Sequence, residues 1–168
     1  MKQQIVVSGR GGQGVLFVTR LLAEAGLEVG AEVLTSETHG MAMRGGTVIS
    51  HIKIGDFRSP LIRKGRADTG LFLTDANIPI HGAYVRAGGT RIVNTDRQGE
   101  YAGIDATACA KELGSLLATN LVLLGFAVRK GALFCDETVM CRVIKQTSRP
   151  SQVELNLRGF EKGLAVTT

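Results

Sequence analysis

Aromatic side chains are scarce in this chain of 168 residues, which contains no tryptophan and in which phenylalanine and tyrosine together make up 5%. Modules that bind nucleic acid by stacking its bases combine aromatic with basic side chains. The formal net charge is +5, but the one dense basic cluster in the sequence, residues 63–66, contains no aromatic residue. We therefore expect no nucleic-acid partner, and we interpret the basic excess as a surface for an acidic partner or an anionic ligand.

Cysteine and histidine are also few. The three cysteines, Cys109, Cys135 and Cys141, are unevenly spaced, and none stands in a C-x-x-C pair. This spacing argues against a disulfide framework and against a locally encoded iron–sulfur site. The three histidines lack the H-E-x-x-H spacing of zinc enzymes, so we expect no metal site on this chain.

Long apolar runs are missing as well. No run reaches the length of a transmembrane helix, and the residues after Met1 lead directly into a short strand pattern without the apolar core of a signal peptide. Together with the isolated cysteines, this predicts a reduced cytoplasmic protein with no membrane partner.

Alternating strand and helix patterns indicate the fold class. Strands are expected over residues 5–7, 31–36, 47–54, 70–74 and 91–94, and helices over 15–25, 79–86, 107–113, 116–130, 137–145 and 151–163. Such alternation predicts an α/β fold with three αβα layers and a mostly parallel, mixed sheet, in which residues 47–54 form the antiparallel strand. The length suits one domain spanning residues 1–168.

A glycine-rich turn between the first strand and the first helix is the most informative motif. It comprises Gly9, Arg10, Gly11, Gly12, Gln13 and Gly14. We expect Gly9 to permit a tight turn, Gly11 to allow a close approach of backbone to ligand, and Gly14 to let the helix pack on the strand. The helix that follows offers unpaired N–H groups and its positive dipole end, so this Rossmann-like loop predicts an anion site. The alternative is a turn that serves packing alone.

An acidic residue near the end of the second strand favours a competing interpretation. Glu37 stands about where dinucleotide-binding domains place the acid that binds the ribose hydroxyls, so a stand-alone NAD or FAD module is the alternative function. Against it, no substrate domain and no hydride-transfer constellation can be recognised. A protein-binding scaffold without a ligand is a third hypothesis.

A second glycine-bearing loop, together with the strand after it, carries a resemblance to a known family. The loop spans residues 36–46 and includes His39-Gly40-Met41 and Arg44-Gly45-Gly46, and the strand is residues 48–52. These residues and the glycine loop resemble the gamma-type subunit of 2-oxoacid:ferredoxin (acceptor) oxidoreductases. Residues 120–125 and 156–163 resemble later segments of the family. The His39-Gly40-Met41 pattern is more similar to the indolepyruvate oxidoreductase beta subunit than to the pyruvate branch.

The resemblance implies a non-catalytic subunit of an enzyme that oxidatively decarboxylates a 2-oxoacid, such as indolepyruvate, pyruvate or 2-oxoglutarate, to an acyl-CoA. Thiamine diphosphate and the iron–sulfur clusters would belong to partner subunits, ferredoxin would be reached indirectly, and CoA would be bound in the assembled enzyme. By itself the chain is then expected to be inactive, and a homodimer is a further arrangement to consider.

The resemblance and the glycine chemistry together give the expected ligand contacts. These are Gly9, Arg10, Gly11, Gly12, Gln13, Gly14, Glu37, Arg44, Gly45 and Gly46, with no catalytic residue among them. Arg44 is expected to bind a carboxylate or a CoA phosphate, or else to form an ion pair within or between subunits. Arg10 either pairs with a phosphate or points to solvent, and Gln13 either orients a ligand or ties the loop to a partner.

Overall fold

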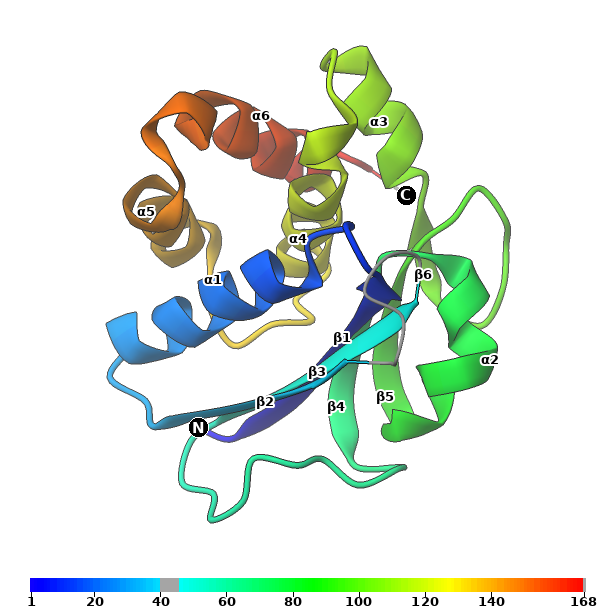
Figure 1. Ribbon diagram of the computed structural model, residues 1–168, viewed down its shortest axis with the longest axis vertical. Coiled ribbons are helices and arrows are strands. Elements are labelled where there is room, and N and C mark those ends of the chain that lie inside the picture. Colours follow the sequence, from blue (N-terminus) through cyan, green and yellow to red (C-terminus); the bar gives the residue numbers. More distant parts are fainter. Residues whose placement is uncertain (40–45, 168) are drawn as a thin grey trace.

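A six-stranded mixed sheet forms the centre of the molecule (Figure 1), whose computed structural model describes residues 1–39 and 46–167. Its strands are β1 (Gln3–Arg10), β2 (Val33–His39), β3 (Thr47–Ile54), β4 (Ala67–Phe72), β5 (Val85–Asn94) and β6 (Ala102–Ile104). They lie in the order β2-β3-β1-β4-β5-β6, and β3 alone runs against the others. The predicted mixed sheet and its antiparallel strand are confirmed.

Helices of different lengths cover the two faces of the sheet. They are α1 (Val15–Glu28), α2 (Ile78–His81), α3 (Ala106–Glu112), α4 (Thr119–Arg129), α5 (Glu137–Thr147) and α6 (Val153–Leu164). Figure 1 shows α1, α4, α5 and α6 together on one side of the strands and α2 on the other. The predicted three layers are therefore present, but the second helical layer is thin.

Alternation along the strands separates two apolar cores. In β1, Ile5 and Val7 face the long helices, whereas Val6 faces the short ones. The larger core contains the stripe of α1 predicted from its 3.6-residue spacing, of which Val18, Leu22 and others are buried. Burying these side chains stabilises the fold by roughly 1.5–3 kcal/mol each, so α1 is held firmly against β1 and fixes the turn between them.

Residues 79–86 differ from prediction. The helix ends at His81, a 3₁₀ turn covers Gly82–Tyr84, and β5 begins at Val85 and continues through Gly88-Gly89, a pair that is typical of turns. Val85 pairs with Ala67 of β4 and is buried, so tertiary pairing outweighs the helical pattern. Gly88 has a φ of +73° within a bulge of this strand pair, which explains the glycine without a chain reversal.

Strand register fixes the position of the two glycine-bearing loops. In the antiparallel β1–β3 pair, Arg10 lies opposite Thr47 and Gln3 lies opposite Ile54. The chain therefore leaves β1 and enters β3 at the same edge of the sheet. No helix within residues 1–39 and 46–167 is long and apolar enough to cross a membrane.

Candidate functional site

The turn from β1 into α1 is built by glycines in left-handed conformations. Gln13 N–H donates to the Arg10 carbonyl at 3.1 Å, which closes the turn. Gly12 and Gly14 have φ values of +90° and +83°, a region that residues with a Cβ adopt only with strain. Gly14 is the N-cap of α1 and supplies no side-chain cap, so the first turn of the helix keeps its N–H groups for another acceptor.

The Gln13 side chain holds this turn from within. Its Oε1 accepts the Arg10 N–H at 2.7 Å, and its Nε2 donates to the Leu73 carbonyl, just after β4, at 3.5 Å. Both ends of the amide are thus used inside the chain. Gln13 stabilises the loop and ties it to the neighbouring strand.

Gly9 and Gly14 serve close packing, although not as the sequence suggested. Gly9 lies in β1 rather than in the turn, and a Cβ there would meet Gln13 Oε1 and Val15 Cγ2, both at 2.9 Å. A Cβ on Gly14 would run into the side-chain amide of Asn120 on α4. Gly14 therefore lets α4, rather than the strand, approach the start of α1.

A buried polar network supports the loop from the other face of the sheet. Asn77 Nδ2 donates to the Gly9 carbonyl at 2.8 Å and to Ser8 Oγ at 3.0 Å, and Ser8 Oγ lies 2.7 Å from His81 Nδ1. Burial lowers the pKa of His81, and the charge of Lys64 lowers it further. The imidazole is therefore neutral at pH 7, and its Nδ1 can accept a hydrogen bond from the Ser8 hydroxyl. Sequence reasoning missed Asn77; its position just after a buried strand was the available signal.

Gly46, the last residue of the second glycine-bearing loop, contacts the glycine loop. Gly11 N–H donates to the Gly46 carbonyl at 2.9 Å, which joins the glycine loop to the residue before β3. This bond occupies a donor that we expected to face a ligand. The predicted contacts Arg44 and Gly45 lie outside the described residues.

Glu37 stands apart from the glycine loop. It is exposed on β2 opposite Ser50 of β3, and β3 separates β2 from β1. Two strand spacings amount to roughly 10 Å, so Glu37 is not next to β1, where a dinucleotide-binding sheet places its ribose-binding acid.

Two hollows of opposite character flank Gln13. The first, of about 290 Å³, is acidic and polar; besides Gln13 it is lined by Leu73, Thr74, Asp75, Asn94, Thr95, Asp96, Asp105 and Thr107. Thr95 Oγ1 donates to Asp75 Oδ2 at 2.8 Å, and Asp105 caps α3 by accepting the Ala108 N–H at 2.8 Å. The carboxylates are held in place and give this side a negative potential.

The second hollow lies between the loop and the start of α4, and we call it the helix-side groove. Two adjoining cavities of about 290 and 210 Å³ form it, both lined by Gly12, Gln13, Leu116, Leu117 and Asn120. Leu116 and Leu117 are 57% and 68% exposed, so the rim is apolar and open. Asn120 is buried, and its Oδ1 has no hydrogen-bond partner among the described residues. The groove thus combines helix N–H groups, an unused acceptor and an apolar rim.

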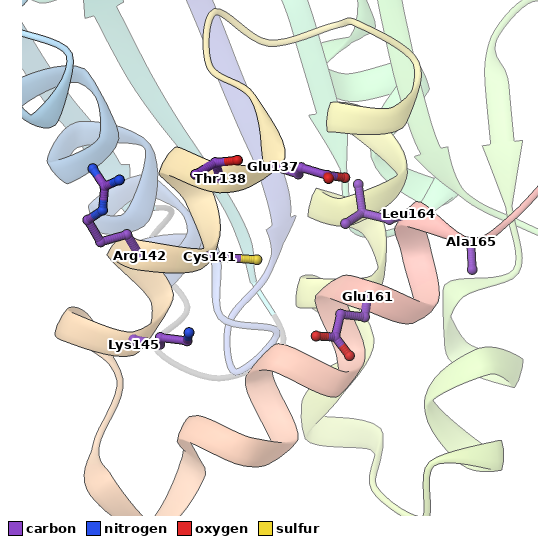
Figure 2. Close-up of a pocket in the computed structure, with 8 residues that line it drawn as sticks. All are labelled: Glu137, Thr138, Cys141, Arg142, Lys145, Glu161, Leu164 and Ala165. Carbon is purple, nitrogen blue, oxygen red and sulfur yellow. The ribbon is translucent and has the colours of Figure 1, made fainter.

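A larger cavity lies elsewhere, between α5 and α6, with a volume of about 670 Å³ (Figure 2). Figure 2 shows Cys141 and Lys145 on α5 across from Glu161 on α6. Burial raises the pKa of Cys141, and the charge of Glu161 raises it further, so its thiol is a poor nucleophile. Arg142 is already paired with Glu28 of α1. The cavity shares no lining residue with the glycine loop, and its mixed charges favour no particular ligand.

The cysteines come from separate places in the chain. Cys109 lies in α3, Cys141 in α5, and Cys135 just before α5, where burial raises its pKa to about 12. Over the described residues, no group of three or more His, Cys, Asp or Glu side chains is placed to hold a metal ion. These residues do not fit an iron–sulfur cluster, which needs several thiolates at one point.

Comparison with known proteins agrees with this fold. The family model of pyruvate ferredoxin/flavodoxin oxidoreductase matches residues 4–166. Indolepyruvate oxidoreductase subunit IorB of Archaeoglobus fulgidus is 32% identical, over 97% of this chain and 94% of its own length. The gamma subunit of keto/oxoacid ferredoxin oxidoreductase from Geobacter sulfurreducens has a TM-score of 0.76 and 28% identity, over 98% of this chain and 99% of that one.

A larger enzyme contains the same fold. This chain spans 30% of the 2-oxoglutarate:ferredoxin oxidoreductase from Magnetococcus marinus, with a TM-score of 0.80 and 20% identity. That enzyme was solved with 2-oxoglutarate, coenzyme A and succinyl-CoA bound. On the family match, which extends over nearly all of its residues, the chain belongs to the pyruvate ferredoxin/flavodoxin oxidoreductase family.

Proposed function

We propose that this chain is a non-catalytic subunit of a 2-oxoacid:ferredoxin oxidoreductase and that its glycine loop holds the phosphates of coenzyme A. The observation that carries the proposal is the start of α1, which has no side-chain cap and opens beside the helix-side groove. A helix of 14 residues presents free N–H groups and a partial positive charge there, which favours a bound anion.

The groove, rather than the acidic hollow, is the side that accepts the anion. Asp75, Asp96 and Asp105 line the hollow, and their charges repel phosphate. The groove has no acidic lining residue, and Arg10 is exposed at the end of β1 nearby. Phosphate therefore sits at Gly12 and the first turn of α1. Arg10 and Arg44 are the cations we propose to pair with it.

Coenzyme A suits this groove because it joins a diphosphate to a long, weakly polar arm. The exposed Leu116 and Leu117 offer apolar contact to that arm, and the side chains of Asn120 and Gln152 give the groove polar lining groups beside them. A ligand with phosphate alone would leave both features without a partner.

In the assembled enzyme, other subunits supply the thiamine diphosphate and the iron–sulfur clusters, and electrons reach ferredoxin through them. Support comes from the relatives, which are themselves named as subunits of oxidoreductases. The similarity to subunit IorB favours indolepyruvate over other 2-oxoacids. The NAD or FAD alternative gains nothing from the structure, since Glu37 is separated from β1 by an antiparallel strand.

Calorimetric titration of CoA into the full chain tests the proposal. Leu117→Asp places a charge on the apolar rim and is expected to weaken CoA binding about tenfold, the order of 1.4 kcal/mol. Leu27→Asp is the matched control, because Leu27 is a leucine of similar exposure, 58%, at the far end of α1. Equal affinities for wild type and both variants, or tighter binding of NAD than of CoA, would contradict the proposal.

A further inference from the structure

A basic surface lies at the opposite end of the sheet from the glycine loop. Residues 53–66, here called the basic segment, contain five basic side chains and one acidic one, so this stretch carries a net +4 of the chain's +5. It starts at the end of β3, beside the beginning of β1, and β1 has eight residues. At about 3.3 Å per residue, its first residues are about 25 Å from the proposed ligand site. The rest of the segment returns along the face covered by the short helices, where Ile62 N–H contacts His51 and Lys64 is close enough to His81 to lower its pKa.

Its cations are crowded and not neutralised within the chain. Lys2 Nζ and Lys53 Nζ both lie 5.1 Å from the centroid of the Phe57 ring. Arg63 is close enough to Lys53 to lower its pKa, after the larger effect of burial. No ion pair within residues 1–39 and 46–167 involves Lys2, Lys53 or Arg63; the nearby Asp68 is instead paired with Arg86.

Four of the five basic side chains of the segment are exposed. They are Arg58, Arg63, Lys64 and Arg66, and none of them makes a side-chain hydrogen bond within the described part of the chain. Mutual repulsion of so many like charges is unfavourable, and a negatively charged partner relieves it.

The backbone beneath these side chains is fixed, although it forms neither helix nor strand. Gly65 N–H donates to the Ala83 carbonyl at 2.8 Å, and Arg66 N–H to the Tyr84 carbonyl at 3.0 Å. Ile62 is buried, and its N–H donates to His51 Nδ1 at 3.1 Å. A long loop held in this way is pre-organised, so binding through it costs little conformational entropy.

An exposed leucine indicates the class of partner. Leu61 is 55% exposed between the basic residues, whereas the ring of Phe57 already contacts the ammonium groups of Lys2 and Lys53. Cations around one apolar anchor suit a protein surface better than a nucleic acid. We infer that the basic segment is a docking surface for an acidic segment of a partner protein that places an apolar side chain against Leu61.

Fluorescence anisotropy of the full chain with a labelled peptide, about ten glutamates around one central leucine, tests this inference. Binding is expected at about 20 mM salt and should weaken at least tenfold at about 200 mM, because the charges are exposed. Arg63→Glu with Lys64→Glu should abolish binding, whereas Arg149→Glu with Arg158→Glu, which reverses two exposed arginines on other elements, should leave it within about twofold.

Leu61→Ser provides a second variant that changes no charge, and it should weaken binding about threefold. Circular dichroism establishes that each variant is folded, and Arg58→Glu with Lys64→Glu replaces the first pair if it is not. Three results would overturn the inference: an equal loss of peptide affinity in the two double charge-reversal variants, absence of peptide binding, or tighter binding of a labelled oligothymidine of equal charge. Since CoA titration reports on the other edge of the sheet, failure here leaves the proposed function intact.

Discussion

Replacing Gly14 with alanine tests the geometry of the glycine loop. The backbone of Gly14 has a φ of +83°, and an alanine held in that left-handed conformation is strained by about 1–2 kcal/mol. The Cβ also collides with the side-chain amide of Asn120, and overpacking of this kind costs about 1–3 kcal/mol. We expect Gly14→Ala to lower the free energy of unfolding by about 2–5 kcal/mol.

Gly12→Ala is the matched control. Its φ is +90°, but a Cβ there meets nothing within 4 Å, so only the backbone strain of about 1–2 kcal/mol applies. The collision itself is isolated by a double-mutant cycle with Asn120→Ala, measured by urea unfolding. Because the second change removes the colliding amide, Gly14→Ala should cost about 1–2 kcal/mol less in the Asn120→Ala background. Additive effects would refute the close contact between Gly14 and α4.

Three further predictions concern stability and reactivity. Gly163→Ala should destabilise by at least about 3 kcal/mol, since its Cβ would overlap the Val122 carbonyl of α4, whereas Gly131→Asn, in open space, should cost under about 1 kcal/mol in thermal melts. Burial lowers the pKa of His81 below the ordinary 6.5, so the unfolded chain binds more protons and stability should fall as pH drops below 6.5; His81→Gln should reduce that fall, and an unchanged pH profile would argue against it. Cys135, whose buried thiol has a pKa of about 12, should react with iodoacetamide only after unfolding, and labelling of the native protein would contradict its burial.

Local patterns predicted α1 and β3. The apolar residues of α1 recur at helical spacing along its buried stripe, and the alternation of β3 places Val48, Ile52 and Ile54 together in the larger core. The pattern failed at Gly88-Gly89, where a glycine pair that fits a turn occupies a bulge in β5. Pairing with the neighbouring strand β4 decides between a turn and a bulge at this glycine pair, and a single sequence does not show which strands are neighbours.

Glycines in the sequence marked the turn before α1, but nothing in the sequence marked the side chains that support it. The Gly11–Gly46 bond joins this turn to the residue before β3. The side chains that fix the loop, Asn77 and Asn120, come from residues far along the chain. Asparagine in a turn or an apolar helix has many ordinary roles, so its type alone did not reveal that contact.

Mapping the bound ligand by amide chemical shifts tests the central claim most directly. On addition of CoA to the isotope-labelled chain, the amides of Gly12, Phe17 and Leu117 should shift, because these residues line the helix-side groove. The amides of Cys141 and Glu161, in the cavity between α5 and α6, should not change. Shifts confined to that cavity, or none at the glycine loop at saturating CoA, would contradict the account.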